Sequence, residues 1–271
     1  MSSRISKVFK SLRLNKRSAF IPYITAGDPD IELSQMLLES LPLGGADIIE
    51  IGMPFSDPMA DGPSIQESSL RSLNNGHDMN KTLMMIERFR VKDKETPIVL
   101  MGYFNPILQF GIKSFIKKCE EVGVDGLIVV DLPIEHSDEI CIPAQKSGID
   151  FINFITPTTN KERLKQILNV SSGFLYFVSI SGITGTKAPD NKIIEELVKN
   201  VKQNTDLPIG VGFGIKSSSQ VEEISDFSDA IVVGSAIVNK VYSLKIKNFD
   251  NDLIVKNMID FLLELSNPLK G

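Results

Sequence analysis

The sequence has few of the residues that metal sites, disulfide frameworks and sugar-stacking surfaces require. Its 271 residues include two cysteines, two histidines and no tryptophan. Cys119 and Cys141 lie far apart in otherwise apolar or helical text, which predicts two free thiols and a reducing, cytoplasmic location. Because His77 and His136 are the only histidines and no Cys-x-x-Cys pair occurs, we expect no metal site.

Long apolar runs and an excess of basic charge are also lacking. No stretch of 18 or more apolar residues occurs, so we expect no membrane-spanning helix. The formal net charge is −5 at pH 7, which argues against a broad nucleic-acid-binding surface. Hydrophobic residues make up 42% and charged residues 23% of the chain, and this composition excludes disordered, collagen-like and coiled-coil proteins.

The first 20 residues are basic and contain no acidic side chain. Organellar transit peptides share this composition. However, Ile5, Val8, Phe9 and Leu12 follow the i, i+3, i+4, i+7 spacing of a helix with one apolar face. We therefore expect residues 1–17 to form a helix that packs on the rest of the chain, and not a removable leader.

Strand-like and helix-like segments alternate along the chain. Apolar runs bounded by Gly, Pro, Asp or Thr predict strands at residues 19–25, 46–51, 98–101, 126–130, 151–155, 174–179, 208–211 and 230–233. Helical spacing occurs between them, for example at residues 31–41, 79–89, 112–122, 161–168, 191–201 and 218–224. Many of the strands are continuously apolar, which is typical of parallel strands buried on both faces. Eight such units predict an α/β fold, with residues 1–271 forming one (β/α)8 TIM-barrel domain.

A doubly wound open sheet is the alternative architecture. Such sheets usually carry a glycine fingerprint after the first strand, and this chain has Thr25-Ala26-Gly27-Asp28-Pro29 at that position. No linker or low-complexity tract divides the chain, so the single barrel is the better interpretation.

In a barrel of this type, the functional site lies at the carboxyl ends of the strands. Glycines end the seventh and eighth predicted strands, at Gly212 and Gly214 and at Gly234, which precedes Ser235 and a short helical stretch at 236–240. Glycines allow close approach of an anion to the backbone, and a helix N-terminus offers free N–H groups. Although either loop alone could be an ordinary turn, together they predict a phosphate site.

Two carboxylates are candidates for acid–base chemistry. Glu50 lies within an apolar strand, where burial raises a carboxyl pKa and suits it to proton transfer near neutral pH. Asp61 ends a loop rich in Pro and Gly and could lie over the barrel mouth. The alternatives are a salt-bridged Glu50 and a turn-forming Asp61, and we expect Asp131 to have an orienting or structural role. Because no lysine stands at a strand end, Schiff-base chemistry is disfavoured.

Several segments resemble the tryptophan synthase α subunit family over essentially the whole chain. They are residues 20–29 (FIPYITAGDP), 47–63 (DIIEIGMPFSDPMADGP), 101–106 (MGYFNP), 126–133 (GLIVVDLP), 176–179 (YFVS), 182–185 (GITG), 210–214 (GVGFG) and 233–236 (VGSA). The loop of residues 53–63 is the most specific of them. Met53 and Met59 replace the usual branched residues, and Ile180 stands where some members have Arg.

The resemblance implies retro-aldol cleavage of indole-3-glycerol phosphate to indole and glyceraldehyde 3-phosphate. It assigns Glu50 as the general acid/base, and Asp61 as the carboxylate that binds the indole N–H and stabilises positive charge there. The implied phosphate contacts are Gly185, Phe213, Gly214, Gly234 and Ser235. The implied indole-pocket residues are Phe20, Ile65, Leu100, Tyr103, Leu127 and Tyr176.

The resemblance also implies a partner, a β subunit that uses pyridoxal phosphate to join indole to serine in an α2β2 heterotetramer. This chain itself would hold no cofactor and no metal. Two other functions stay open from the sequence: a different phosphosugar barrel enzyme, and a non-catalytic regulatory subunit. The first would lack the loop of residues 53–63, and the presence of both Glu50 and Asp61 argues against the second.

Overall fold

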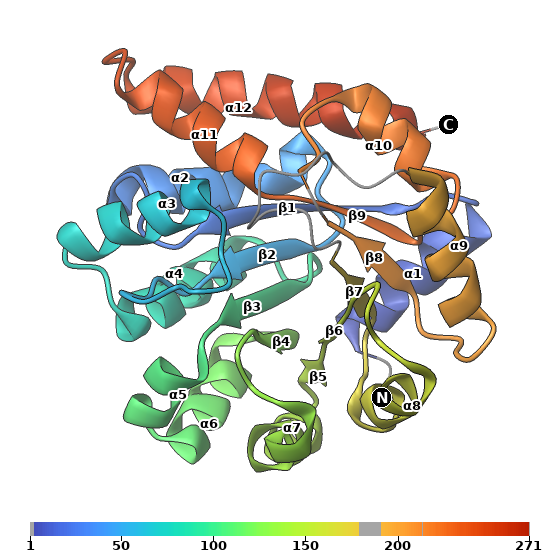
Figure 1. Cartoon of the computed structure of the whole chain (residues 1–271). Helices are drawn as coiled ribbons and strands as arrows, with labels where there is room; N and C mark the ends of the chain where they lie inside the picture. Colours follow the sequence, from blue (N-terminus) through green and yellow to red (C-terminus); the bar gives the residue numbers. More distant parts are fainter. Residues whose placement is uncertain (1–2, 179–190, 213, 271) are drawn as a thin grey trace.

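The computed structural model describes residues 3–178, 191–212 and 214–270. Within them, nine strands form one sheet in the order β5-β4-β3-β2-β1-β9-β8-β7-β6, and every neighbouring pair is parallel. Figure 1 shows the strands at the centre of the molecule with helices outside them. The strands are β1 (Ala19–Thr25), β2 (Ile49–Gly52), β3 (Ile98–Gly102), β4 (Gly126–Val129), β5 (Asp150–Phe151), β6 (Asn153–Ile155), β7 (Leu175–Phe177), β8 (Ile209–Val211) and β9 (Ala230–Val233).

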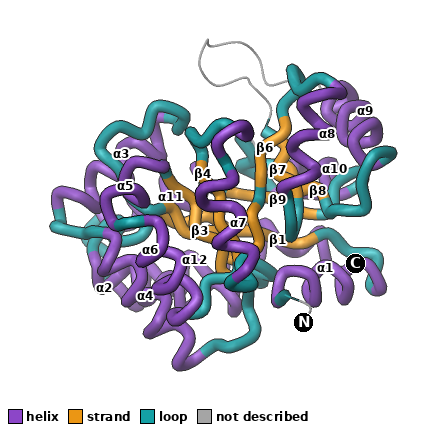
Figure 2. The backbone as a smooth tube through the Cα atoms, turned by 90° about the horizontal axis from the view of Figure 1, so that it is seen from below, coloured by secondary structure: helices purple, strands orange, loops and turns teal. Residues whose placement is uncertain are grey.

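The sheet closes through its fifth strand, which Ile152 divides into β5 and β6. β5 pairs with β4, and β6 pairs with β7. The backbone continues both ladders, because the Ile152 N–H donates to the Leu127 carbonyl (2.9 Å) and the Ser172 N–H donates to the Phe151 carbonyl (2.9 Å). Because β5 and β6 together form one strand of the barrel, the described residues form eight barrel strands. The predicted (β/α)8 TIM barrel is therefore confirmed. Figure 1 shows the strands arranged in a ring, and Figure 2 shows them from another side, between the surrounding helices.

Helices surround the strands of the barrel (Figure 1). They are α1 (Arg4–Leu14), α2 (Ile31–Ser40), α3 (Pro63–Asn74), α4 (Met79–Lys92), α5 (Phe104–Phe110), α6 (Ile112–Val122), α7 (Asp138–Lys146), α8 (Lys161–Val170), α9 (Asn191–Lys202), α10 (Ser218–Ser225), α11 (Ser235–Lys245) and α12 (Asn251–Ser266). Capping side chains fix several starts: Asp30, Asp78 and Asp250 each accept a backbone N–H in the first turn of α2, α4 and α12. No helix within the described ranges is long and apolar enough to cross a membrane.

The apolar residues form two layers. The inner layer fills the barrel and includes Ile21, Val99 and Ile128, which are 0% exposed. The outer layer lies between the strands and the surrounding helices and includes Leu100 and Leu127. Neighbouring residues of one strand thus belong to different layers, as the period of two in a β-strand requires.

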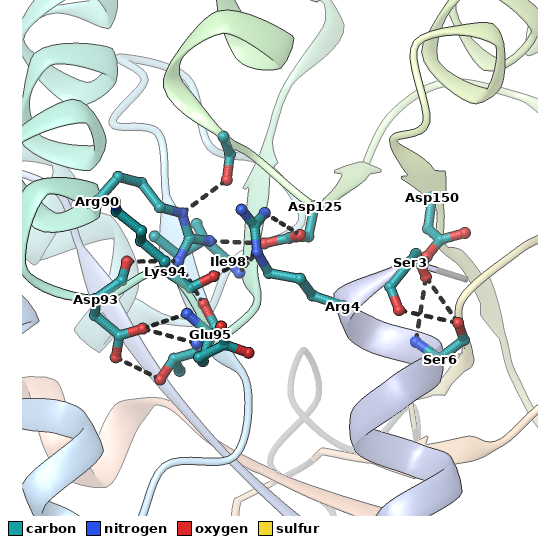
Figure 3. A network of polar contacts seen from close by, with 12 residues as sticks. Ser3, Arg4, Ser6, Arg90, Asp93, Lys94, Glu95, Ile98, Asp125 and Asp150 are labelled. Atoms are coloured by element: carbon teal, nitrogen blue, oxygen red, sulfur yellow. Dashed lines mark hydrogen bonds and ion pairs between the residues drawn. The ribbon is translucent and has the colours of Figure 1, made fainter. Parts of the chain in front are cut away.

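Helix α1 packs against the barrel, as the spacing of its apolar residues predicts. Ile5, Phe9 and Leu12 are buried within the inner layer, and the rings of Phe9 and Phe174 lie 5.7 Å apart. A buried carboxylate holds the start of the helix: Asp125 accepts hydrogen bonds from Arg4 (2.8 Å) and Arg90 (2.7 Å). Figure 3 shows these two guanidinium groups converging on Asp125. This contact joins α1 and α4 to the start of β4.

The predicted elements exist, and their boundaries differ from prediction in a few places. The second strand begins at Ile49, three residues later than predicted, and the fifth is interrupted at Ile152. The short helical stretch after Gly234 is the beginning of α11, which continues to Lys245. Part of the predicted strand 174–179 lies outside the described residues, which give β7 as Leu175–Phe177.

Candidate active site

A pocket of about 510 Å³ opens at the carboxyl ends of the strands, the end where the site was predicted. It brings together the ends of β1, β2, β3, β7, β8 and β9 with the first residues of α3 and α11. The described residues that line it are Tyr23, Glu50, Ala60, Asp61, Gly62, Pro63, Ser64, Ile65, Met101, Tyr176, Val178, Gly212, Gly214, Ile215, Lys216, Val232, Gly234 and Ser235.

Glu50 reaches the pocket from the inner face of β2 and is 1% exposed. Its Oε2 atom is buried and has no hydrogen-bond partner among the described residues. Loss of hydration and, to a lesser extent, the nearby charge of Asp61 raise the pKa of the Glu50 carboxyl to about 8. Glu50 is therefore a neutral acid at pH 7, in an environment that favours its proton-bearing form. The alternative of a salt-bridged Glu50 is excluded within the described residues, since no cation pairs with it.

Asp61 lines the same pocket near Glu50, directly before the N-cap of α3. The Tyr103 hydroxyl donates a hydrogen bond to Asp61 Oδ2 (3.0 Å) and accepts one from the Ala60 N–H (3.1 Å), which fixes the loop to the end of β3. Burial raises the pKa of Asp61 to about 6, although the Tyr103 hydrogen bond opposes this shift. At pH 7 Asp61 is thus mostly ionised while Glu50 is protonated, so the two carboxyl groups differ in charge.

A chain of hydroxyl groups ties the β1 wall of the pocket to α3. Ser68 donates to the Ile65 carbonyl (2.8 Å), so the Thr25 hydroxyl donates to Ser68 (2.6 Å). Thr25 then accepts from the Tyr23 hydroxyl (3.2 Å). Because each hydroxyl has one proton, the carbonyl at the end of the chain sets the direction of every donor. The chain holds Ile65, which the resemblance placed in the indole pocket, against β1.

The rings of Tyr23 and Tyr176 form parts of the pocket wall. Tyr23 packs against Gly52, and Tyr176 packs against Gly212. A Cβ atom added at Gly52 would lie 2.6 Å from Tyr23 Cζ, and one added at Gly212 would lie 2.7 Å from Tyr176 Cε2. Real Cβ atoms do not approach other atoms so closely, so only glycine leaves room for these rings. Tyr176 also packs on Phe154, with ring centroids 5.2 Å apart.

The other end of the pocket has the features of an anion site. Gly234 and Ser235 form the start of α11, whose unpaired N–H groups and dipole favour negative charge. Gly214, on the adjacent loop after β8, has φ of +58° and lines the same space. The predicted contacts Gly214, Gly234 and Ser235 therefore lie together, whereas Gly185 and Phe213 lie outside the described residues.

The structure corrects three of the six expected indole-pocket residues. Phe20, Leu100 and Leu127 belong to the outer layer between strands and helices, and they do not line the pocket. Ile65 and Tyr176 line it, and Tyr103 lies beside it as the partner of Asp61. Strand residues of the opposite parity line the pocket instead. They are Tyr23, Met101 and Val232.

Other expected positions lie where the sequence placed them or nearby. The Asp131 carboxylate accepts the Phe104 N–H (2.7 Å) at the start of α5, an orienting contact. Met53 is 5% exposed, and Met59 is 70% exposed on the loop that carries Asp61. No group of three or more His, Cys, Asp or Glu that could hold a metal ion occurs in the part of the chain that the structure describes.

Comparison with known proteins identifies the architecture. A subunit alpha of tryptophan synthase from Legionella pneumophila str. Paris superposes with a TM-score of 0.93 at 36% sequence identity, covering 100% of this chain and 99% of that one. A chain of tryptophan synthase from M. tuberculosis, in an open form, superposes with a TM-score of 0.87 at 31% identity, covering 99% of both chains. A chain from Aquifex aeolicus VF5 gives 0.87 at 33% identity, covering 98% of this chain and 99% of that one.

The family comparison covers the same elements. The sequence model described as "Tryptophan synthase alpha chain" matches residues 9–260, which include every strand of the barrel and every described residue of the pocket. This match extends over more than nine-tenths of the 271 residues and agrees with the structural similarity along the whole chain. The chain therefore belongs to the tryptophan synthase alpha chain family.

Proposed function

We propose that Glu50 and Asp61 catalyse the half-reaction of this family, the cleavage of indole-3-glycerol phosphate to indole and glyceraldehyde 3-phosphate. The observation that carries the assignment is the buried Glu50 and the partly buried Asp61 in one pocket, with the pKa of Glu50 raised to about 8 and that of Asp61 to about 6. Two acidic groups held in different protonation states at neutral pH divide the roles of acid and charge stabiliser between them.

Glu50 begins as the neutral acid and gives its proton to the indole ring carbon that bears the glycerol chain. The ring becomes positively charged, and the Asp61 carboxylate stabilises that charge through a hydrogen bond from the indole N–H. The Glu50 carboxylate then takes the proton of the hydroxyl on the adjacent glycerol carbon. The carbon–carbon bond breaks, its electron pair returns to the ring, and the aldehyde forms. Glu50 ends protonated, ready for the next turnover.

The two ends of the pocket match the two ends of this substrate. Gly234 and Ser235 at the start of α11, and Gly214 on the loop after β8, bind the phosphate through backbone N–H groups. At the carboxylate end, Ile65 and Tyr176 contact the indole ring, and Tyr103 positions Asp61. The residues Tyr23, Met101 and Val232 complete the wall on that side.

The product indole passes to a β subunit, with which this chain forms an α2β2 heterotetramer. Pyridoxal phosphate belongs to that partner, and this chain uses no cofactor of its own. The protein acts in the cytoplasm as one domain of residues 1–271. These statements rest on the family match, on the free and buried Cys119 and Cys141, and on the continuous barrel.

The loop of residues 53–61 connects partner docking to Asp61. Met59 is exposed there, while the Phe55 ring packs on Tyr103 with centroids 5.3 Å apart. Tyr103 in turn donates a hydrogen bond to Asp61. A partner bound to the exposed side of the loop therefore affects the Asp61 carboxylate through the Phe55–Tyr103 and Tyr103–Asp61 contacts. We expect the β subunit to raise the rate of indole formation by fixing this loop. We also expect residues 180–189 to close over the phosphate, and these residues lie outside the described part of the chain.

The test is indole formation from indole-3-glycerol phosphate, by the chain alone and with a saturating β subunit. Glu50→Gln keeps the shape and removes the acid, so kcat should fall by at least about 10²-fold. Glu67→Gln is the matched control, because Glu67 is exposed on α3 and does not line the pocket. A Glu50→Gln variant with more than about a tenth of the parental kcat contradicts the acid/base role.

Thermal unfolding separates lost chemistry from lost structure. The folded chain keeps the Glu50 proton up to about pH 8, whereas the unfolded chain releases it near pH 4.5. Stability therefore falls as pH rises between these values, because the unfolded state binds fewer protons. Glu50→Gln carries no such penalty and should be at least as stable as the parent at pH 8. A large fall in its unfolding temperature would mean that lost activity reports lost structure.

A further inference from the structure

The lining of the pocket is unbalanced in charge. Glu50 and Asp61 place two carboxyl groups at one end, and Lys216 is the single Lys or Arg among the described lining residues. Lys216 lies on the loop after β8, two residues after Gly214, and β8 neighbours β9, whose end leads into α11. It therefore stands beside the start of α11, where Gly234 and Ser235 also line the pocket.

The backbone of Lys216 is fixed at the rim. Ile215, the residue before Lys216, is 3% exposed and packs in the outer apolar layer, so the chain is anchored directly before Lys216. The Lys216 N–H donates to Gln220 Oε1 (2.7 Å) in the first turn of α10. The side chain itself is exposed and forms no ion pair with a carboxylate in the described ranges. An anchored backbone thus carries an ammonium group without a partner at the pocket mouth.

We propose that Lys216 binds the phosphate group of the substrate and discriminates phosphorylated from unphosphorylated indole compounds. This inference rests on the proposed function of the pocket. A phosphate monoester carries a charge of −1.5 to −2 at pH 7, while a helix N-terminus supplies only about half a positive charge. The Lys216 ammonium supplies a full positive charge and three donors, and it opposes the repulsion of the ionised Asp61.

The contribution of Lys216 to phosphate affinity is limited by the exposure of its side chain. Lys216 stays hydrated in the free protein, so binding costs little desolvation but competes with water and salt. A partly exposed, charge-assisted contact of this kind corresponds to an affinity change of about 3- to 10-fold. The backbone groups of Gly214, Gly234 and Ser235 remain after Lys216 is changed, so phosphate binding weakens without being lost.

The experiment measures two dissociation constants and the kinetics in the complex with the β subunit. The ligands are indole-3-propanol phosphate, which lacks the hydroxyl needed for cleavage, and indole-3-propanol, which also lacks the phosphate. The variants are Lys216→Gln, which removes the charge, and Lys216→Arg, which keeps it. Lys247→Gln is the matched control, because Lys247 is an exposed lysine just beyond the far end of α11.

Lys216→Gln should weaken binding of indole-3-propanol phosphate about 3- to 10-fold and leave binding of indole-3-propanol unchanged. KM for indole-3-glycerol phosphate should rise by the same factor, with little change in kcat, and the difference from the parent should shrink as salt rises. Lys216→Arg keeps the positive charge, so its dissociation constant for indole-3-propanol phosphate should lie within about 2-fold of the parental value. The remaining difference reflects the different shape of the guanidinium group. Lys247→Gln should match the parent.

Two results overturn the inference: unchanged affinity for the phosphorylated ligand in Lys216→Gln, or equal weakening for both ligands. Either result leaves the proposed function standing if the parent binds indole-3-propanol phosphate and releases indole from the substrate. If the parent does neither, the proposed function fails instead. The parent measurements thus distinguish the two failures.

Discussion

Gly210 on β8 and Gly212 directly after this strand form a matched pair for testing how the pocket wall is built. Both residues point to the inner face of the barrel, and neither has a positive φ. A Cβ at Gly210 would lie 3.4 Å from the Phe174 ring and 3.5 Å from Ala230, which is ordinary contact. At Gly212 it would lie 2.7 Å from Tyr176 Cε2 and 2.9 Å from Cζ, and closer still to the hydroxyl oxygen.

The Gly212→Ala substitution must therefore displace the Tyr176 ring by about 1 Å to reach normal carbon–carbon separations. Tyr176 is 9% exposed and packs on Phe154, so the ring has little room to move. Overpacking of this kind costs about 1–3 kcal/mol, or a fall in unfolding temperature of about 2–10 °C in a chain of this length. A 1 Å displacement beside Glu50 should lower kcat/KM by up to about 10²-fold.

The assay compares thermal unfolding and indole formation in Gly212→Ala, Gly210→Ala and the parent, at one scan rate. Gly210→Ala should keep its activity and gain up to about 1 kcal/mol, because alanine restricts the unfolded chain. Adding Tyr176→Phe to Gly212→Ala should restore stability only in part, since the ring carbons still collide. If Gly212→Ala and Gly210→Ala have the same unfolding temperature and the same activity, the inference that the Tyr176 ring lies tightly against Gly212 is wrong.

The charged groups lead to three further predictions. The plot of log(kcat/KM) against pH should be bell-shaped, with an acid limb near pH 6, below which Asp61 becomes protonated, and an alkaline limb near pH 8, above which Glu50 loses its proton. Tyr103→Phe removes a hydrogen bond that lowers the pKa of Asp61, so the acid limb should move to higher pH; an unmoved limb would separate Tyr103 from that titration. Asp125→Asn leaves the largely buried Arg90 without its carboxylate and should cost about 3 kcal/mol or more in denaturant unfolding, whereas a cost below about 1 kcal/mol would contradict that ion pair.

The sequence by itself determined the order of the strands and helices and the end of the barrel that carries the site. Apolar runs bounded by Gly, Pro, Asp or Thr are local signals, and parallel strands joined by helices place all carboxyl ends together. Glu50 was also predictable from the sequence, because burying a carboxylate inside an apolar strand costs free energy and therefore indicates a function. The glycines before α11 likewise predicted the anion end of the pocket.

Only the tertiary structure decided which face of each strand points into the barrel. Strands buried on both faces show no alternation of polar and apolar residues, so the sequence does not distinguish Leu100 from Met101. In β1 the distinction comes from the pairing of Tyr23 with Glu50 across the β1–β2 ladder, a contact between residues far apart in the chain. Lys216 also became a candidate only through its place at the pocket rim, because an exposed lysine in a loop carries no signal in the sequence.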